Sequence, residues 1–479
     1  MPHNPTEGPH PRAQARTREM LRLRYASLSM TGPTPRARSE SFTVVQSPIS
    51  RAQSPRQTGR GTMATATQVS TEPEVRDHVA AGAIITSHTL QHLYGHAFWV
   101  ILPTIYAALG LNPITAGLVG TVRQVGSGVS STVGGFLVDR LQHRRLLILY
   151  LSLTAMGLGY FLVGAAPTYV LILGALMVAS IAGSIWHPTA RGLLSQIYPR
   201  RRGFMITVDR SAGSIGDSAG PLLAGFLLAY LLWQQIFLAA FPLALIFMFF
   251  LWTLLRRSEA FQNVGARSRG ESRPIGAQLR EIKGLFKENS RILTLLILIK
   301  AVAGFGQGGL FLWLPLYLSE QLGMSEIGIG FHLALLTAMG TITNPAFGYL
   351  SDRIGRMPVI VIALTAKVAI AVLLALSGAG AMFTLLVAVM GAFNFVVNPL
   401  VQTWALDIAH GRRLEGSTLG VLDGANFIFT GIGPLLVGVV VATWGFESLF
   451  WYIAAISAAA LVVVMFTLPF ARAGWQSRM

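Results

Sequence analysis

Residues 220–225 read Gly-Pro-Leu-Leu-Ala-Gly, and residues 433–438 read Gly-Pro-Leu-Leu-Val-Gly. Each motif stands inside a long apolar segment, at the same distance from a preceding glycine, Gly203 or Gly416. Glycine and proline let helices pack closely and bend in lipid, where neighbouring groups satisfy the freed backbone. The recurrence of this landmark indicates that the chain is an internal duplication.

Three further landmarks recur in the same order. Residues 134–140, Gly-Gly-Phe-Leu-Val-Asp-Arg, match residues 347–353, Phe-Gly-Tyr-Leu-Ser-Asp-Arg. The other matched pairs are His187-Pro188 with Asn398-Pro399 and Leu102-Pro103 with Leu314-Pro315. Transporters built from repeats carry such kinks at equivalent places in both halves, with the binding site between the repeats.

The composition places these repeats in a membrane. Charged residues make up 12% of the chain and the mean hydropathy is +0.56, whereas soluble domains carry about 25% charged residues. The apolar segments are each long enough to cross roughly 30 Å of hydrocarbon. The predicted spans are 80–109, 114–138, 146–165, 168–194, 203–230, 233–255, 292–319, 326–350, 357–378, 381–407, 416–442 and 447–469.

The connections between spans alternate in charge. One set is rich in arginine, and the other set, near Asn112, Pro167, Gln234, Gly323, Gly380 and Gly445, holds no Lys or Arg. Because positive charge stays on the cytoplasmic side, both termini are predicted to be cytoplasmic. The arginines concerned are Arg140, Arg144, Arg145, Arg200, Arg201, Arg202, Arg353, Arg356, Arg412 and Arg413.

The predicted organisation has five parts. A Pro-, Ser- and Arg-rich tail at residues 1–78 contains no apolar run and is expected to be disordered; alternatively, Met63 is the start and the preceding residues are an extension of the gene assignment. Residues 79–255 form the first six-helix bundle and residues 292–470 the second. They are joined by a basic cytoplasmic linker, residues 256–291, and followed by a short tail, 471–479.

The loop motif at residues 134–145 and its weaker copy at 347–356 resemble the signature of the major facilitator superfamily. Within it, the segment from Trp186-His187-Pro188 to Gly220-Pro221-Leu222 resembles the fosmidomycin-resistance branch. The resemblance implies twelve helices in two pseudo-symmetric bundles, alternating access, and a cavity lined by spans one, four, seven and ten. Gln142-His143 departs from the signature, which prefers glycine there.

Ionisable groups inside hydrocarbon are expensive, so each marks a candidate site. His88, His92 and His96 lie one turn apart in the first span and share one side of the helix. Imidazole changes charge nearest neutral pH, which suits proton loading. Asp217 lies near mid-membrane depth, where the lack of water disfavours a charged carboxyl group. The predicted proton-coupling groups are Asp217, Asp209, Asp423, His92 and His96.

These residues also admit other roles. Asp217 and at least one histidine could instead make ordinary hydrogen bonds between helices. No metal site is expected, because no carboxylate lies near the histidines within their own helix. The sequence likewise indicates no cofactor.

A second set of residues is predicted to line the substrate cavity. Arg123 stands alone in the second span, and a guanidinium there favours an anionic partner from the protein or the substrate. An aromatic-rich wall suits an amphipathic or drug-like solute, although anchoring at the lipid interface explains Trp313 and Trp404 equally well. The predicted cavity residues are Arg123, Trp99, Trp186, His187, Asn394, Asn398 and Asn426.

A third set lies toward the cytoplasmic ends of the spans and is interpreted as gating. Aligning the repeats places Asp423 opposite Arg210 and Lys300 opposite His88, so the halves carry opposite charges at one equivalent position. In the loop motif, Asp139 can form a clasp with neighbouring arginines, or simply anchor the topology. The predicted gating residues are Asp139, Arg140, Arg144, Asp352, Arg353, Arg191, Arg210 and Lys300.

The resulting prediction is a proton-driven exporter of a small organic or drug-like molecule, acting by antiport. Uptake of an organic anion by proton symport is the alternative, and a non-transporting sensor or scaffold is a third. No Walker-type phosphate loop supports ATP drive, and no constellation supports an enzyme. The expected partners are a small-molecule substrate, protons and the bilayer of a bacterial plasma membrane, with the chain monomeric and no nucleic-acid role.

Overall fold

The structure, a computed structural model, describes residues 74–262, 275–409 and 415–467. Within these ranges, the side chains at 132–140, 142, 275, 277–279, 281–282, 285, 409, 415–421 and 423–425 are not described. The predicted tails, 1–78 and 471–479, therefore lie outside it, except that α2 opens within residues 74–78.

The first half of the chain forms six membrane segments. They are α2 (Val75–Ala108), α3 (Pro113–Arg140), α4 (Arg145–Ala165), α5 (Tyr169–Ile197), α6 (Arg202–Leu228), and α7 (Trp233–Leu238) with α8 (Ala240–Leu255). α2 packs against α6, and α4 lies between α5 and α8.

The second half repeats this arrangement after the linker helix α10 (Ile275–Glu288). Its segments are α11 (Ser290–Glu320), α12 (Glu326–Ile354), α13 (Arg356–Leu376), α14 (Ala381–Asn394) with α15 (Val397–Ala409), α16 (Glu415–Trp444) and α17 (Ser448–Met465). α11 packs against α16, as its counterpart α2 packs against α6.

Nine of these twelve segments are long and apolar enough to span a membrane by composition alone. The other three, α2, α3 and α6, carry the buried polar and charged side chains described below. The prediction of an all-α membrane protein with twelve spans in two six-helix bundles is confirmed.

Two predicted spans are each broken into two helices, and a proline stands just after each break. A proline has no N–H to donate to the carbonyl four residues earlier, and its ring clashes there. Pro399 therefore interrupts the ladder at Phe395, between α14 and α15, and Pro242 interrupts it at Leu238, between α7 and α8.

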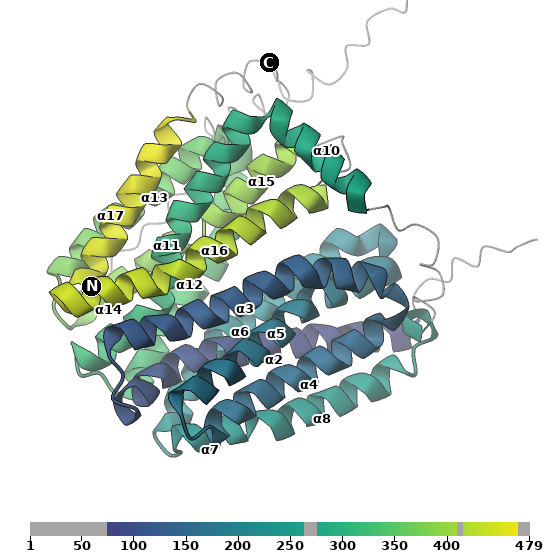
Figure 1. Cartoon of the computed structure of the whole chain (residues 1–479), viewed down its shortest axis with the longest axis horizontal. Coiled ribbons are helices and arrows are strands. Elements are labelled where there is room, and N and C mark those ends of the chain that lie inside the picture. Colours follow the sequence, from purple (N-terminus) through teal and green to yellow (C-terminus); the bar gives the residue numbers. More distant parts are fainter. Residues whose placement is uncertain (1–73, 263–274, 410–414, 468–479) are drawn as a thin grey trace, which may run out of the picture. The chain divides into compact units, whose positions relative to one another are not determined.

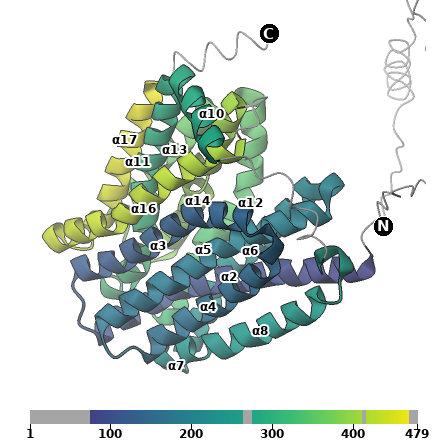
Figure 2. The ribbon, with the colours of Figure 1, turned by 45° about the vertical axis from the view of Figure 1, so that its right-hand side comes forward.

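The two bundles meet along two seams, α3 with α16 and α6 with α12. Figures 1 and 2 both show α16 running alongside α3. A Cβ at Gly225 would lie 2.5 Å from the Glu326 carbonyl oxygen at the start of α12. A Cβ at Gly438 would lie 2.6 Å from the Pro113 carbonyl oxygen at the start of α3. The duplicated motif thus supplies one close-packed glycine to each seam.

The helix ends define two sides of the protein. We call the side where α3 and α12 end the basic end, because Arg144, Arg200–Arg202 and Arg356 lie there. The opposite side is the non-basic end. Hydrogen bonds between the bundles lie from mid-span toward the non-basic end: Thr121 Oγ1 donates to the Gly431 carbonyl at 2.7 Å, and Thr337 Oγ1 lies 3.2 Å from the Asp217 carbonyl.

Candidate functional site

Close packing of α2 on α6 builds the site. A Cβ at Gly220 would lie 2.5 Å from the Leu93 carbonyl oxygen, and one at Gly216 would collide with the Thr89 carbonyl. Glycine at both positions lets the two backbones approach. The histidine face of α2 therefore lies directly against the acidic face of α6.

Two histidines of α2 converge on one carboxylate of α6. His92 Nδ1 lies 2.5 Å and His96 Nδ1 2.8 Å from Asp217 Oδ1, and all three side chains are about a quarter exposed. Nδ1–H tautomers of both imidazoles would donate to the same oxygen. The shared face predicted for the histidines is thus the face that contacts Asp217.

One turn closer to the basic end, a second pair is completely buried. His88 Nδ1 lies 2.9 Å from Asp209 Oδ1, and Arg191 Nε lies 3.7 Å from Asp209 Oδ2. The Asp209 side chain is 0% exposed, whereas its neighbour Arg210 is exposed. The two residues point in different directions, as expected for neighbours about 100° apart on a helix.

The rings of α5 complete this cluster. Trp186 packs on His88 with ring centroids 4.8 Å apart, and His187 lies 5.0 Å from His88 and 5.5 Å from His92. We call His88, His92, His96, His187, Asp209 and Asp217 the histidine–carboxylate cluster. It joins three helices of the first bundle, although its members are far apart in sequence.

A polar cavity of about 170 Å³ adjoins the cluster and receives side chains from both bundles. Asp217 belongs to both features, since it contacts the imidazoles and also lines the cavity. Carboxamides, hydroxyls and one guanidinium dominate the wall, and its one aromatic ring is Phe395. The lining residues are Arg210, Ser214, Asp217, Gln307, Thr337, Thr341, Asn344, Phe395, Asn398, Pro399 and Gln402.

Two amide oxygens of the cavity wall lack hydrogen-bond partners. Asn344 Oδ1 and Asn398 Oδ1 are buried and have no hydrogen-bond partner within the described part of the chain. Because buried polar atoms normally find partners, these oxygens are suited to receive hydrogen bonds from a solute. A small polar molecule fits this wall better than an apolar one.

Of the seven residues predicted to line the substrate cavity, Asn398 lies in this lining. Trp186 is 1% exposed and packs on His88 within the first bundle. Asn394 is buried at the end of α14. The remaining predicted residues, Trp99, Arg123, His187 and Asn426, also lie outside the lining.

Arg123 has no carboxylate partner among the described residues, so of the two anions expected for it only one from the substrate stays open. Its guanidinium lies 4.4 Å from the ring centroid of Phe98 and 4.2 Å from that of Trp99. It donates hydrogen bonds to the Gly95 carbonyl at 3.1 Å and to Tyr160 Oη at 3.2 Å. Cation–π contacts and neutral acceptors hold this charge, so Arg123 fixes α3 to α2.

The cavity residues that sequence reasoning missed follow a recognisable pattern. Thr337, Thr341 and Asn344 lie at helical spacing along one side of α12, inside an otherwise apolar segment. A polar stripe of this kind marks the face of a membrane helix that points away from lipid. Gln307 and Gln402 are single amides in apolar spans and carry a weaker signal.

The predicted gate is partly described. Asp352 pairs with Arg356, whose Nε also lies 3.4 Å from Asp407 at the end of α15, while Arg353 stacks on Tyr349. Arg356 and Asp407, which make these ion pairs, were not among the predicted gating residues. Arg144 is exposed and Lys300 is buried. The side chains of Asp139, Arg140 and Asp423 lie outside those described.

Known proteins with this architecture are transporters. The pattern of the Major Facilitator Superfamily matches residues 84–421. A putative metabolite transport protein of Haemophilus influenzae is 27% identical over 378 residues, covering 77% of this chain and 90% of the relative. The multidrug resistance protein MdtG of Enterobacter lignolyticus is 28% identical over 374 residues, covering 75% of this chain and 85% of that protein.

Solved structures agree on the fold. The nucleoside transporter NupG superposes with a TM-score of 0.67 at 13% sequence identity, covering 81% of this chain and 99% of that structure. An inward-facing bacterial homologue of the lysosomal transporter Spinster gives 0.64 at 16% identity, covering 83% and 96%. Helix arrangement, duplicated motif and sequence pattern agree: this chain is a transporter of the major facilitator superfamily and not an enzyme.

Proposed function

We propose that this protein exports a small polar organic molecule in exchange for protons by alternating access. One observation carries the proposal. Asp217, the carboxylate that two imidazoles contact, also forms part of the cavity wall shared by the two bundles. A proton and a solute can therefore influence each other at a single group.

The coupling follows from reciprocity. A solute that brings a donor or a positive charge to Asp217 favours its charged form, so solute binding promotes proton release, and proton binding promotes solute release by the same factor. His92 and His96 offer neighbouring positions for the proton. Exchange of one ligand for the other on opposite sides of the membrane is antiport.

The proposed orientation places the basic end in the cytoplasm, following the rule that positive loops stay inside. The seams then close the outer side, where Gly225 and Gly438 pack. The cavity lies between mid-span and the basic end, since Arg210 and Gln402 belong to its wall. With this orientation, the position of the cavity supports a state that loads solute from the cytoplasm.

Export is supported by the resemblance to proteins named for multidrug resistance, and by the fifth-span pattern around Gly220-Pro221. The polar wall favours hydroxylated or charged solutes within the drug-like class. The alternative, uptake of an organic anion with protons, is favoured by Arg210, an exposed guanidinium in the cavity wall.

The test uses the full chain in liposomes with an imposed pH gradient and a trapped pH-sensitive dye. A panel of cationic, neutral and anionic solutes is added, and solute-dependent proton flux is recorded. Asp217→Asn should abolish the proton flux, while Glu447→Gln, an exposed carboxylate that contacts Gln321, should leave it unchanged.

The direction of flux separates the alternatives. In antiport, solute and protons move oppositely; in symport, they move together. Solute flux driven by a sodium gradient, with no proton movement for any compound, would overturn proton coupling. Proton flux that persists in Asp217→Asn would remove Asp217 from the mechanism.

A further inference from the structure

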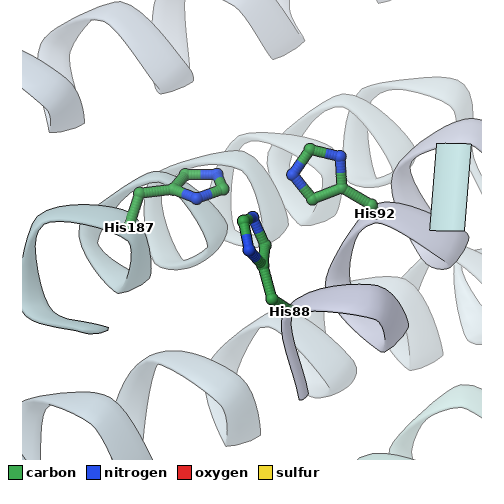
Figure 3. A group of neighbouring side chains, drawn as sticks. All are labelled: His88, His92 and His187. Atoms are coloured by element: carbon green, nitrogen blue, oxygen red, sulfur yellow. The ribbon is translucent and has the colours of Figure 1, made fainter. Parts of the chain in front are cut away.

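Three imidazoles meet inside the first bundle, His88 and His92 from α2 and His187 from α5. Figure 3 shows the rings gathered around one point. Their centroids are 4.6, 5.0 and 5.5 Å apart. Three imidazoles on one tetrahedral ion, each bound at about 2.05 Å, have centroids about 5 Å apart. The ring spacing is therefore already that of a three-histidine metal site.

The nitrogens face a space that Gly213 leaves open. A Cβ at Gly213 would lie 3.1 Å from His88 Nε2 and 3.2 Å from His92 Nε2. One nitrogen from each of the three rings lies within 4.8 Å of the others. Bringing them to the roughly 3.4 Å separation of tetrahedral ligands takes small ring rotations.

Two of the three rings carry nitrogens without partners. His88 is 1% exposed, and neither of its ring nitrogens has a hydrogen-bond partner within the described part of the chain; His187 Nδ1 also has none there. A buried polar atom without a partner is unfavourable and calls for an explanation. A bound ion supplies the missing partner to both rings.

Carboxylates stand behind two of the three rings. Asp209 Oδ1 lies 2.9 Å from His88 Nδ1, and Asp217 Oδ1 lies 2.5 Å from His92 Nδ1. Asp217 is a hydrogen-bond partner of His92 Nδ1, and a carboxylate that accepts the Nδ1 proton fixes the tautomer, orients the ring and leaves the Nε2 lone pair for a metal. Asp209 places a negative charge beside the His88 ring but makes no hydrogen bond to it. Arg191 lies close to Asp209 and offsets part of its negative charge.

We propose that His88, His92 and His187 bind a divalent transition-metal ion of the class that prefers imidazole, such as Zn²⁺ or Co²⁺. Three neutral nitrogen donors suit these ions, whereas Mg²⁺ and Ca²⁺ require oxygen ligands. The expectation of no metal considered only the helix that carries the histidines. The missing groups come from α5 and α6. The site does not depend on the proposed proton exchange.

The test is direct metal binding to the full chain in detergent, stripped with a chelator and freed of any polyhistidine tag. Co²⁺ is titrated while the visible absorption of tetrahedral cobalt is recorded, followed by displacement with Zn²⁺. A single ion per chain is expected, with no displacement by excess Mg²⁺. His88→Gln and His187→Gln should each weaken binding at least about 100-fold, because each removes a ligand and loss of even an outer-shell partner costs about 10- to 100-fold.

Two controls and one additional variant sharpen the result. His96→Gln, which leaves the three ligands in place, and His332→Gln, whose ring contacts the Gly328 carbonyl and Thr384 in the other bundle, should bind normally. Gly213→Ala keeps every ligand but puts a methyl group where the ion would sit, so it should abolish binding. Normal cobalt binding in Gly213→Ala, or equal losses in His332→Gln and His187→Gln, would overturn the proposal, as would the absence of stoichiometric binding to the wild type. Because no transport is measured, failure here leaves the proton-exchange proposal standing.

Discussion

Replacing Thr337 with valine should loosen the seam between α6 and α12. Pro221 has no N–H, so it leaves the Asp217 carbonyl without its usual donor four residues later in the helix. The Thr337 hydroxyl lies 3.2 Å from that carbonyl oxygen and 3.2 Å from Ser218 Oγ, and so contacts the other bundle at the proposed coupling residue. Valine keeps the shape of the side chain and removes the donor.

The size of the effect follows from the competing acceptors. A buried carbonyl left without a partner costs about 1–3 kcal/mol. The Thr337 hydroxyl has one proton, which it also shares with the carbonyls of Leu333 at 3.1 Å and Ala334 at 3.0 Å in its own helix. The contact between the bundles therefore holds the proton only part of the time. We expect the lower limit, about 1 kcal/mol, which changes the ratio of seam-closed to seam-open molecules about fivefold.

The chain contains no cysteine, so spin labels can be placed without removing native thiols. Tyr230→Cys and Ile327→Cys introduce labels at exposed positions beside the non-basic ends of α6 and α12. Pulsed electron–electron double resonance measures the distance between the two labels. The population of seam-open molecules, with the longer distance, should rise about fivefold in Thr337→Val. Thr343→Val is the matched control, because its hydroxyl bonds the Ala392 carbonyl at 2.9 Å within one bundle. Unchanged distances in Thr337→Val, or an equal change in Thr343→Val, would refute the reasoning.

Three other outcomes follow from described contacts. Gly225→Ala should force the α6–α12 seam apart at a cost of about 1–3 kcal/mol. The melting temperature in detergent and the solute flux in liposomes should both fall, and normal values for both would contradict the close packing of Gly225 at this seam. Arg123→Gln should destabilise the first bundle by up to about 2 kcal/mol through lost cation–π contacts, which thermal unfolding in detergent measures; an unchanged melting temperature would speak against these contacts. Zn²⁺ should slow proton-coupled flux in the wild type but not in Gly213→Ala, because a metal bound to His92 fixes the ring that contacts Asp217. Equal inhibition of both proteins would show that Zn²⁺ acts at another site.

Much of the fold can be predicted from the sequence, because a lipid bilayer requires long apolar helices separated by polar loops. Each apolar stretch must satisfy its own backbone, so its length and the loop arginines suffice to locate the helices. The two helix breaks were not predictable in this way. Pro242 and Pro399 each free the carbonyl four residues earlier, but other prolines, such as Pro221 and Pro434, lie inside continuous helices. Gly225 and Gly438 occupy equivalent places in the repeat, but only the structure shows that they pack at the two seams.

The candidate site was less accessible, because its members come from different helices. Helical spacing placed His88, His92 and His96 on one face, but it could not show that this face meets Asp209 and Asp217. The decisive signal was the glycine pattern of α6, which predicts a close neighbour without identifying it. Aromatic residues were the weaker guide: Trp186 fills space between helices of the first bundle, while amides and hydroxyls line the cavity.

The duplication also accounts for the position of the histidine–carboxylate cluster in the first half. Aligning α11 with α2 places Gly304 and Gly308 at the positions of His92 and His96, and Thr430 of α16 takes the place of Asp217. These residues meet in the same way: a Cβ at Gly308 would lie 2.5 Å from the Thr430 carbonyl oxygen. In the second half, α11 and α16 thus pair as α2 and α6 do in the first half. Closely packed backbone occupies the space that the histidines and Asp217 fill there. The proposed proton and metal sites both lie in the first bundle, while the second contributes all four amides of the cavity wall. Coupling between the bundles would then pass through shared contacts such as that of Thr337 with Asp217.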